Sequence, residues 1–228
     1  MSENPLLRYF ENNSGRRIHK WMHYFDIYHR HFSRFRDAEP TVLEFGVNHG
    51  GSLQMWKQYF GTGARIYGVD INPKCKLVEE EGIEVFIGDQ QDRHFLRELA
   101  ASIGPIQVLI DDGGHKMRQQ ITTFEEVYPS VSVPGVYLVE DLHTSYWRKW
   151  GGGIRRRGSF IEYSKRLIDQ LHAWHIYRKR TGWHIGSRIS VDDFTRSAYS
   201  MTYYDSVLVV EKRKIEKPDV RRTGYRSF

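Results

Sequence analysis

Apolar and polar positions follow two periods along the central part of the chain. Short apolar runs typical of buried strands are separated by segments whose apolar residues recur every three or four positions, as in amphipathic helices. The expected strands are 41–47, 64–71, 83–89, 106–112 and 135–143, and the expected helices are 52–60, 77–82, 93–104 and 117–131. Strands that alternate with crossover helices pair in parallel. The pattern therefore predicts an α/β fold with a Rossmann-like, doubly wound, mostly parallel sheet.

Three further segments surround or interrupt this region. Apolar spacings of three and four predict a helical N-terminal arm over 1–39, which we expect to act as a lid or subunit contact. Residues 144–197 break the alternation with glycine and arginine runs, an amphipathic helix over 159–174 and a second basic loop, and are expected to be an insertion that carries a substrate loop. Two extended runs meeting at Asp205-Ser206 predict an antiparallel hairpin before a basic tail, 211–228. A chain of 228 residues fits one domain with these appendages.

Composition narrows the class of protein. The sequence has no apolar run long enough for a membrane span, and its N-terminus lacks the apolar core of a secretory signal. Cys75 is the only cysteine, which excludes an intrachain disulfide and favours the cytoplasm. The net charge of +6 is concentrated at the termini and in Arg155–Arg157. These basic residues are either solvated or face an anionic partner.

The turn after the first expected strand reads EFGVNHGG. A dinucleotide fingerprint requires glycine where Asn48 stands, so NAD is disfavoured. Asp70 follows the second strand at the distance at which an acid binds ribose hydroxyls, and Asp89 and Gln90 follow the third, where they can meet an adenine edge. Together these positions predict an adenosine without phosphates. The alternative is that Glu44 is a surface acid and Asp70 caps a helix before Asn72-Pro73.

Two acidic motifs end neighbouring strands of the predicted sheet. VLIDDGGH ends the fourth strand and LVEDLH ends the fifth. Neighbouring parallel strands lie about 4.8 Å apart, so Asp112, Glu140 and Asp141 can converge on one point. Three carboxylates suit Mg²⁺, whereas structural zinc requires imidazole and thiolate ligands. The alternative is that Asp111 and Asp112 cap the following helix and His115 lies in its first turn.

At these residues a resemblance to a known family becomes clear. Residues 40–143 and the hairpin 198–213 resemble class I S-adenosylmethionine-dependent methyltransferases, and DDGGHK with EDLHTSYW resembles the metal-dependent sugar O-methyltransferases of macrocin and mycinamicin type, whose relatives include cephalosporin-hydroxylase-like proteins. The resemblance implies S-adenosylmethionine as methyl donor, Mg²⁺ bound by Asp112, Glu140 and Asp141, and His115 as general base. The expected cofactor contacts are Glu44, Gly46, Asn48, Gly51, Ser52, Asp70, Asp89, Gln90 and Asp111.

The sequence departs from this family in two respects. Gly114 stands where serine is common, and only about 40 residues precede the first strand, whereas larger members carry a long N-terminal domain. Both differences bear on substrate and assembly rather than on the metal ligands.

The leading hypothesis is a Mg²⁺-dependent O-methyltransferase acting on a sugar hydroxyl of a glycosylated natural product, as in antibiotic biosynthesis, or of a bacterial glycan. A sugar hydroxyl has a high pKa, which metal coordination lowers so that His115 can accept the proton. Candidate substrate contacts are Tyr146, Trp147, Trp150 and His143, of which the aromatic residues can equally anchor the insertion. The alternatives are a basic RNA methyltransferase and a non-catalytic adenosine-binding module. A homo-oligomer is expected because the arm is strongly aromatic.

Overall fold

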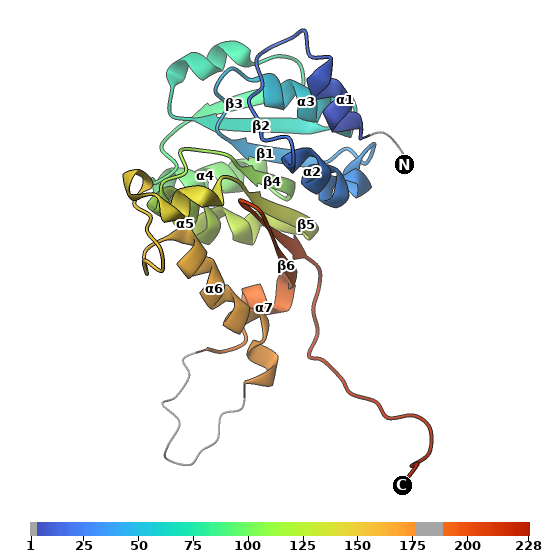
Figure 1. Cartoon of the computed structure of the whole chain (residues 1–228). Helices are drawn as coiled ribbons and strands as arrows, with labels where there is room; N and C mark the ends of the chain where they lie inside the picture. Colours follow the sequence, from blue (N-terminus) through green and yellow to red (C-terminus); the bar gives the residue numbers. More distant parts are fainter. Residues whose placement is uncertain (1–3, 177–188) are drawn as a thin grey trace.

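The computed structural model describes residues 4–176 and 189–228, so the second basic loop expected within 144–197 lies largely outside the described residues. Seven strands form one sheet in the order β3-β2-β1-β4-β5-β7-β6 (Figure 1). They are β1 Thr41–Phe45, β2 Arg65–Asp70, β3 Ile83–Ile87, β4 Ile106–Asp111, β5 Val131–Val139, β6 Ala198–Tyr204 and β7 Val207–Lys212. Strands β1 to β5 are parallel, and β7 runs antiparallel to β5 and β6. The predicted mostly parallel, doubly wound sheet is confirmed.

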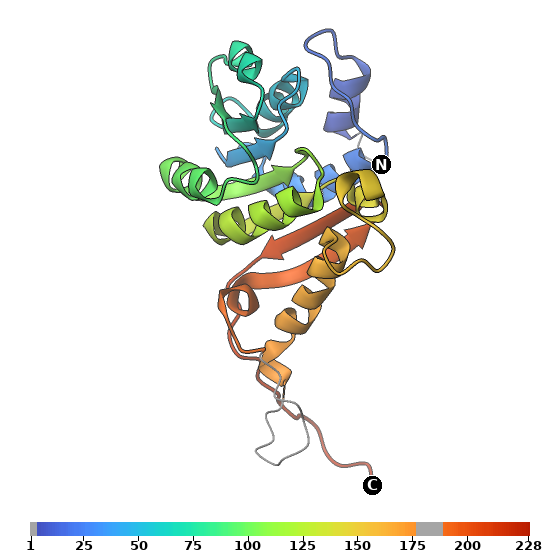
Figure 2. The same cartoon turned by 90° about the vertical axis from the view of Figure 1, so that its left-hand side faces the viewer.

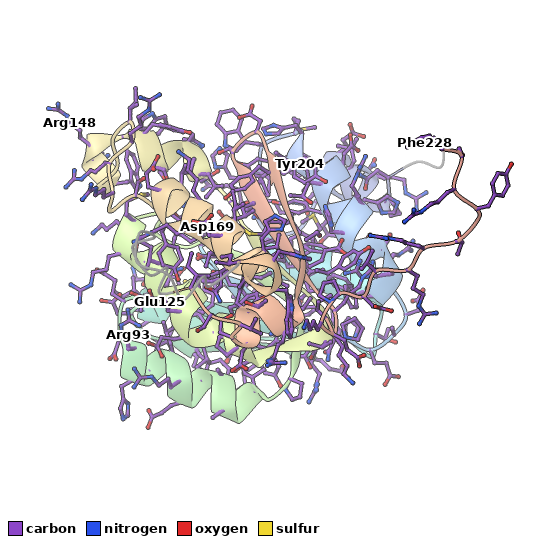
Figure 3. The ribbon with its side chains drawn as sticks, turned by 90° about the horizontal axis from the view of Figure 1, so that it is seen from below. Arg93, Glu125, Arg148, Asp169, Tyr204 and Phe228 are labelled. Carbon is purple, nitrogen blue, oxygen red and sulfur yellow. The ribbon has the colours of Figure 1, made fainter. Side chains whose placement is uncertain are left out.

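Helices cover both faces of the sheet (Figure 2). The α-helices are α1 Pro5–Glu11, α2 Tyr24–Phe32, α3 Gly51–Phe60, α4 Arg93–Ile103, α5 Met117–Val127, α6 Phe160–Leu171 and α7 Asp193–Ser197. Helices α1, α2 and α3 share one buried apolar cluster with the sheet, and α4, α5, α6 and α7 share the other. The arm therefore belongs to the same layer as α3. At the surface, Arg93 of α4 pairs with Glu125 and Glu126 of α5 (Figure 3).

The helix prediction for the N-terminal arm is only partly correct. Residues 12–23 between α1 and α2 are irregular, apart from a turn before Tyr24. The Asn13 side chain accepts a hydrogen bond from the Gly15 amide and donates one to the Arg16 carbonyl, which stabilises a turn at the expense of helix. This irregular segment reaches the carboxyl ends of the central strands.

A second helix prediction is wrong in its bounds. The segment 77–82 was expected to be helical, but the helical turns are a 3-10 helix over Pro73–Val78. Asn72 caps this helix by accepting the Lys74 amide, and Pro73 occupies its first position, where the lost N–H costs nothing. The Glu79 carboxylate then binds the Val85 amide and draws 79–82 into the approach to β3.

The C-terminal hairpin is confirmed. Strands β6 and β7 meet at Asp205-Ser206, and β7 inserts between β5 and β6. The turn also supports the loop that follows β5, because the Leu142 amide donates to the Ser206 carbonyl (2.9 Å). Among the described residues, no helix combines the length and apolarity needed to cross a membrane.

Candidate active site

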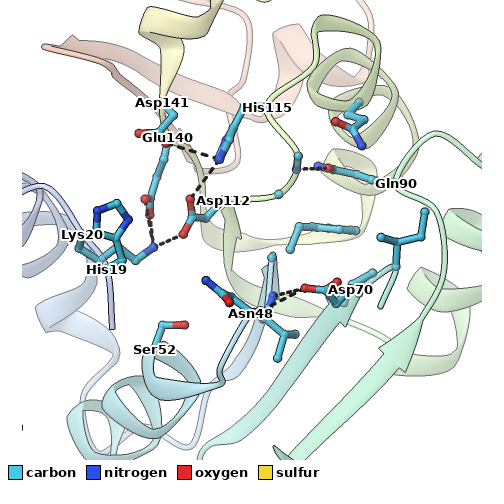
Figure 4. Close-up of a pocket in the computed structure, with 18 of the residues that line it drawn as sticks. His19, Lys20, Asn48, Ser52, Asp70, Gln90, Asp112, His115, Glu140 and Asp141 are labelled. Atoms are coloured by element: carbon cyan, nitrogen blue, oxygen red, sulfur yellow. Dashed lines mark hydrogen bonds and ion pairs between the residues drawn. The ribbon is translucent and has the colours of Figure 1, made fainter. Parts of the chain in front are cut away.

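The carboxyl ends of β1 to β5 surround one cavity of about 410 Å³ (Figure 4). Ligands of open α/β sheets bind at this edge, at the point where the helices that follow two neighbouring strands, here α3 after β1 and α5 after β4, lie on opposite faces of the sheet. Most of the predicted site residues line the cavity: Gly46, Asn48, Ser52, Asp70, Asp89, Gln90, Asp112, His115, Glu140 and Asp141. The arm contributes 17–21 and Tyr24 to the same wall.

Asp70 organises the turn after β1. One oxygen of its carboxylate accepts the amides of Val47 (3.0 Å) and Asn48 (3.1 Å), and the other accepts the amide of Asn72 (2.9 Å). Asn72, and not Asp70, is the N-cap of the 3-10 helix over Pro73–Val78, so the alternative role of Asp70 as a helix cap is wrong. Through these hydrogen bonds Asp70 fixes the backbone of the glycine turn, and it also lines the cavity.

Three of the expected cofactor residues lie behind the cavity wall. Glu44 is fully buried and accepts the hydroxyl of Ser52 (2.6 Å), so it is not a surface acid. Gly51 is closely packed, since a Cβ there would overlap the carbonyl oxygens of Arg16 and Arg17. Asp111 is buried and accepts hydrogen bonds from Gln90 (2.5 Å) and Tyr137 (3.3 Å). These residues shape the wall rather than line it.

Burial raises the pKa of Asp111 to about 7, although hydrogen bonds from Gln90, the Gly113 backbone and Tyr137 oppose the shift. Gln90 in turn accepts the Gly114 amide (3.2 Å). The buried aspartate thereby fixes the Gln90 side chain, which spans the β3 end and the loop after β4.

Asp112, His115 and Asp141 form a group that can hold a metal ion. One ligand atom from each lies within 4.8 Å of the other two. Nε2 of His115 is 3.5 Å from Asp141 and 3.9 Å from Asp112. His115 and Asp141 both have positive φ, near +54° and +55°, a conformation that costs free energy and is concentrated at functional sites. The carboxylate oxygens of Asp112 and Asp141 are ligands that suit a hard divalent cation such as Mg²⁺ or Mn²⁺.

The capping alternative for the DDGGH motif is wrong. Helix α5 begins at Met117 with Lys116 as its N-cap, and neither Asp111 nor Asp112 bonds its first turn. Asp112 instead points into the cavity, where one of its oxygens contacts Lys20 of the arm (2.6 Å).

Lys20 is the principal feature that sequence reasoning missed. Its side chain is 3% exposed, and its ammonium contacts Asp112, both oxygens of Glu140 (3.1 and 3.0 Å) and, more distantly, Glu44 (3.5 Å). Burial lowers the pKa of Lys20. The negative charges of Asp112 and Glu140, with smaller contributions from Tyr28 and Glu44, outweigh burial and hold the pKa well above its usual value. Lys20 is therefore an ammonium ion. It lies in an irregular segment, so no periodicity pointed to it.

Glu140 is the least accessible of the three predicted metal ligands. It is buried, and besides Lys20 it accepts the hydroxyl of Tyr28 (2.5 Å). Burial and the neighbouring Asp112 raise its pKa, while Lys20 and Tyr28 lower it, leaving the pKa well above the ordinary value. In this arrangement both oxygens of Glu140 already have partners within the protein.

The candidate substrate contacts lie beyond the cavity wall. The ring of His143 contacts Trp147 (4.6 Å between centroids) and Trp21 (6.0 Å), and its Nδ1 is 2.5 Å from the Ser206 hydroxyl. Trp21, which the sequence analysis did not select, lines the cavity and is 54% exposed. Tyr146 is half exposed, and Trp150 packs against the second core cluster. Arg155–Arg157 are exposed.

Comparison with known proteins places these features in a family context. No protein-family model matches the sequence. The chain is 38% identical over 198 residues, 83% of its length, to 8-demethyl-8-alpha-L-rhamnosyl tetracenomycin-C 2'-O-methyltransferase of Streptomyces olivaceus, and 43% identical over 143 residues, 58% of its length, to demethylmacrocin O-methyltransferase of Streptomyces fradiae. These alignments cover 50% and 36% of the two relatives.

A comparison with solved structures points to the same group of proteins. MycE methyltransferase from the mycinamycin biosynthetic pathway, in complex with Mg and SAH, superimposes with a TM-score of 0.79 and 31% identity, covering 92% of this chain and 54% of that one. The chain thus spans about half the length of the tetracenomycin relative and of MycE. It has the class I S-adenosylmethionine-dependent methyltransferase fold and is a homologue of the macrocin- and mycinamicin-type sugar O-methyltransferases.

Proposed function

We propose that this protein is a metal-dependent O-methyltransferase that transfers a methyl group from S-adenosylmethionine to a sugar hydroxyl of a glycosylated natural product. The observation that carries the proposal is the presence, in one cavity, of an adenosine-type wall with Asp70 and Gln90 and a pair of carboxylates, Asp112 and Asp141, with His115 beside them. The relatives named for rhamnosyl tetracenomycin and macrocin methylation, and the MycE complex with Mg, SAH and mycinamycin VI, support it.

The methyl donor would occupy the side of the cavity formed by β1, β2 and β3. Asp70 would bind the ribose hydroxyls, and Asp89 and Gln90 would meet the adenine edge. Gly46, Asn48 and Ser52 would face the methionine part. Glu44 and Asp111 would act through Ser52 and Gln90, to which they are hydrogen-bonded, and Gly51 would act through its close packing against the backbone of Arg16 and Arg17.

Asp112 and Asp141 would hold the metal. Glu140, the third predicted ligand, lines the same cavity, but its oxygens accept hydrogen bonds from Lys20 and Tyr28. A bound divalent cation supplies Lewis acidity, which lowers the pKa of an alcohol and orients it. Mg²⁺ requires few protein ligands, so open positions remain for two neighbouring hydroxyls of one sugar ring. Such chelation would fix which hydroxyl faces the methyl group.

His115 would be the general base. Its Nε2 faces Asp112 and Asp141, while its Nδ1 is buried and has no hydrogen-bond partner among the described residues. Nε2 would take the hydroxyl proton as the sugar oxygen forms a bond to the methyl carbon and the carbon–sulfur bond breaks. The products are the methyl ether, S-adenosylhomocysteine and a proton held on His115.

The test is methyl transfer to a rhamnosylated polyketide acceptor with and without metal. Activity that EDTA abolishes and Mg²⁺ restores is the expected result. Turnover that persists in EDTA would contradict the metal role, and transfer to RNA but not to glycosides would favour the RNA methyltransferase. Binding of S-adenosylhomocysteine without turnover on any glycoside would favour the non-catalytic module.

A further inference from the structure

The N-terminal arm bonds every carboxylate of the predicted metal trio. Lys20 contacts Asp112 and Glu140, the hydroxyl of Tyr24 donates to Asp141 (2.8 Å), and that of Tyr28 donates to Glu140 (2.5 Å). The arm is far from these acids in sequence, but the irregular segment places Lys20 beside Asp112 and Glu140 (Figure 4).

These contacts divide the oxygens of the two aspartates. Asp112 gives one oxygen to Lys20 and turns the other toward His115 at 3.9 Å. Asp141 gives one oxygen to Tyr24 and turns the other toward His115 at 3.5 Å. One oxygen of each aspartate therefore contacts the arm, and the other faces His115, where we expect the metal to bind.

Charge makes Lys20 different from the two tyrosines. Asp112, Glu140 and Asp141 bring three carboxylates to this end of the cavity, and Glu44 lies behind the wall. Apart from Lys20, no lysine or arginine of the described chain forms an ion pair with these four acids. A divalent cation on Asp112 would lie close to the Lys20 ammonium, which contacts the same carboxylate. Two cations at that separation repel strongly where little water screens them.

We propose, on the basis of the proposed function, that Lys20 is an internal cation of the metal site, which competes with the divalent metal for Asp112 and Glu140. Lys20 neutralises part of the carboxylate cluster before metal arrives and thereby limits how tightly the metal binds. It is a positioning residue, since it touches the predicted ligands and not the reacting atoms. Arm docking and metal binding are linked with opposite sign, because each cation weakens the hold of the carboxylates on the other.

The first experiment is calorimetric titration of Mg²⁺ alone into the wild type, Lys20→Met and two controls. Lys20→Arg keeps the charge in place, and Lys149→Met removes one exposed positive charge outside the cavity. We expect Lys20→Met to bind Mg²⁺ about tenfold more tightly than the wild type, and both controls to remain within about threefold. Equal or weaker binding by Lys20→Met overturns the proposal.

The outcomes separate this proposal from the proposed function. If the wild type binds Mg²⁺ and Lys20→Met binds it no better, only the role of Lys20 is wrong. If neither protein binds the ion, both proposals fail. If only Lys20→Met binds it, Lys20 does compete, but the wild type is not a Mg²⁺ enzyme.

A second measurement on the wild type covers the case in which Lys20→Met does not fold. Saturating Mg²⁺ should accelerate amide hydrogen exchange in residues 16–24, since the metal weakens the hold of the carboxylates on Lys20. Exchange in α4, which lies on the opposite face, is the internal reference. Unchanged or slower exchange in 16–24 would overturn the competition.

Discussion

Gly46 and Asp112 are packed backbone against backbone, so that a Cβ at residue 46 would overlap the Asp112 carbonyl oxygen. Gly46 has φ of +92° and belongs to the turn after β1, whereas Asp112 follows β4. The turn proposed to bind the cofactor and the first proposed metal ligand are thus one packed unit. A change at residue 46 should therefore act on both halves of the site.

Gly46→Ala tests this coupling, and Gly104→Ala is its matched control. Both glycines have positive φ, but nothing lies within 4 Å of a Cβ at residue 104. Gly104→Ala should lose only the conformational contribution of a backbone that glycine alone adopts readily, about 1–3 kcal/mol in urea unfolding. Gly46→Ala should lose more and should also bind both Mg²⁺ and S-adenosylhomocysteine more weakly. Equal effects of the two substitutions would argue against the coupling.

Asp70→Asn should weaken S-adenosylhomocysteine binding at least tenfold in calorimetry. The carboxylate accepts three backbone amides and is expected to bind the ribose, and hydrogen bonds to a charged acceptor contribute about 1.5–3 kcal/mol. Glu84→Gln, on the neighbouring strand β3 and outside the cavity, should bind as the wild type does. Unchanged affinity in Asp70→Asn would remove Asp70 from the cofactor site.

His115→Ala should lower kcat by about 10²- to 10⁴-fold, as expected for loss of a general base. Its Mg²⁺ affinity, measured without cofactor, should change little. This second readout matters because Nε2 also lies near Asp112 and Asp141. A large loss of Mg²⁺ affinity would instead make His115 a metal ligand.

Lys212 provides a pH dependence away from the active site. Burial lowers its pKa from 10.5 to about 8, although Asp193 opposes the shift. Between these values the unfolded chain binds more protons, so the destabilisation is complete below pH 8 and disappears as pH rises to about 10.5. Relative to Lys212→Met, the wild type should gain up to about 3 kcal/mol of unfolding free energy across this range. A constant difference would contradict the lowered pKa.

The sheet and the positions of the carboxylates could be predicted because both depend on local pattern. Apolar runs that end at Asp70 or Asp112 indicate strands and the edge where they end, and parallel pairing then brings those ends together. The roles of Asp111 and Glu44 could not be predicted. The pattern of apolar and polar residues along a strand does not distinguish a side chain that lines the cavity from one buried behind the cavity lining.

Lys20 and Trp21 escaped prediction for a different reason. They reach the cavity from an irregular segment whose path depends on turns such as that at Asn13 and on contacts with residues about 90 to 120 positions away. The apolar residues of the arm, spaced by three and four positions, predicted a continuous helix, which would have placed Lys20 and Trp21 elsewhere.

The Asp205-Ser206 turn also determines the order in which the parts of the site can form during synthesis. Ser206 holds Leu142 and His143, the two residues that follow Asp141, and β7 reaches this position only by inserting between β5 and β6. During synthesis the ribosome releases β1 to β3, which carry the proposed cofactor wall, before it releases the hairpin. Asp141, which follows β5, therefore acquires its final support only after β6 and β7 have emerged.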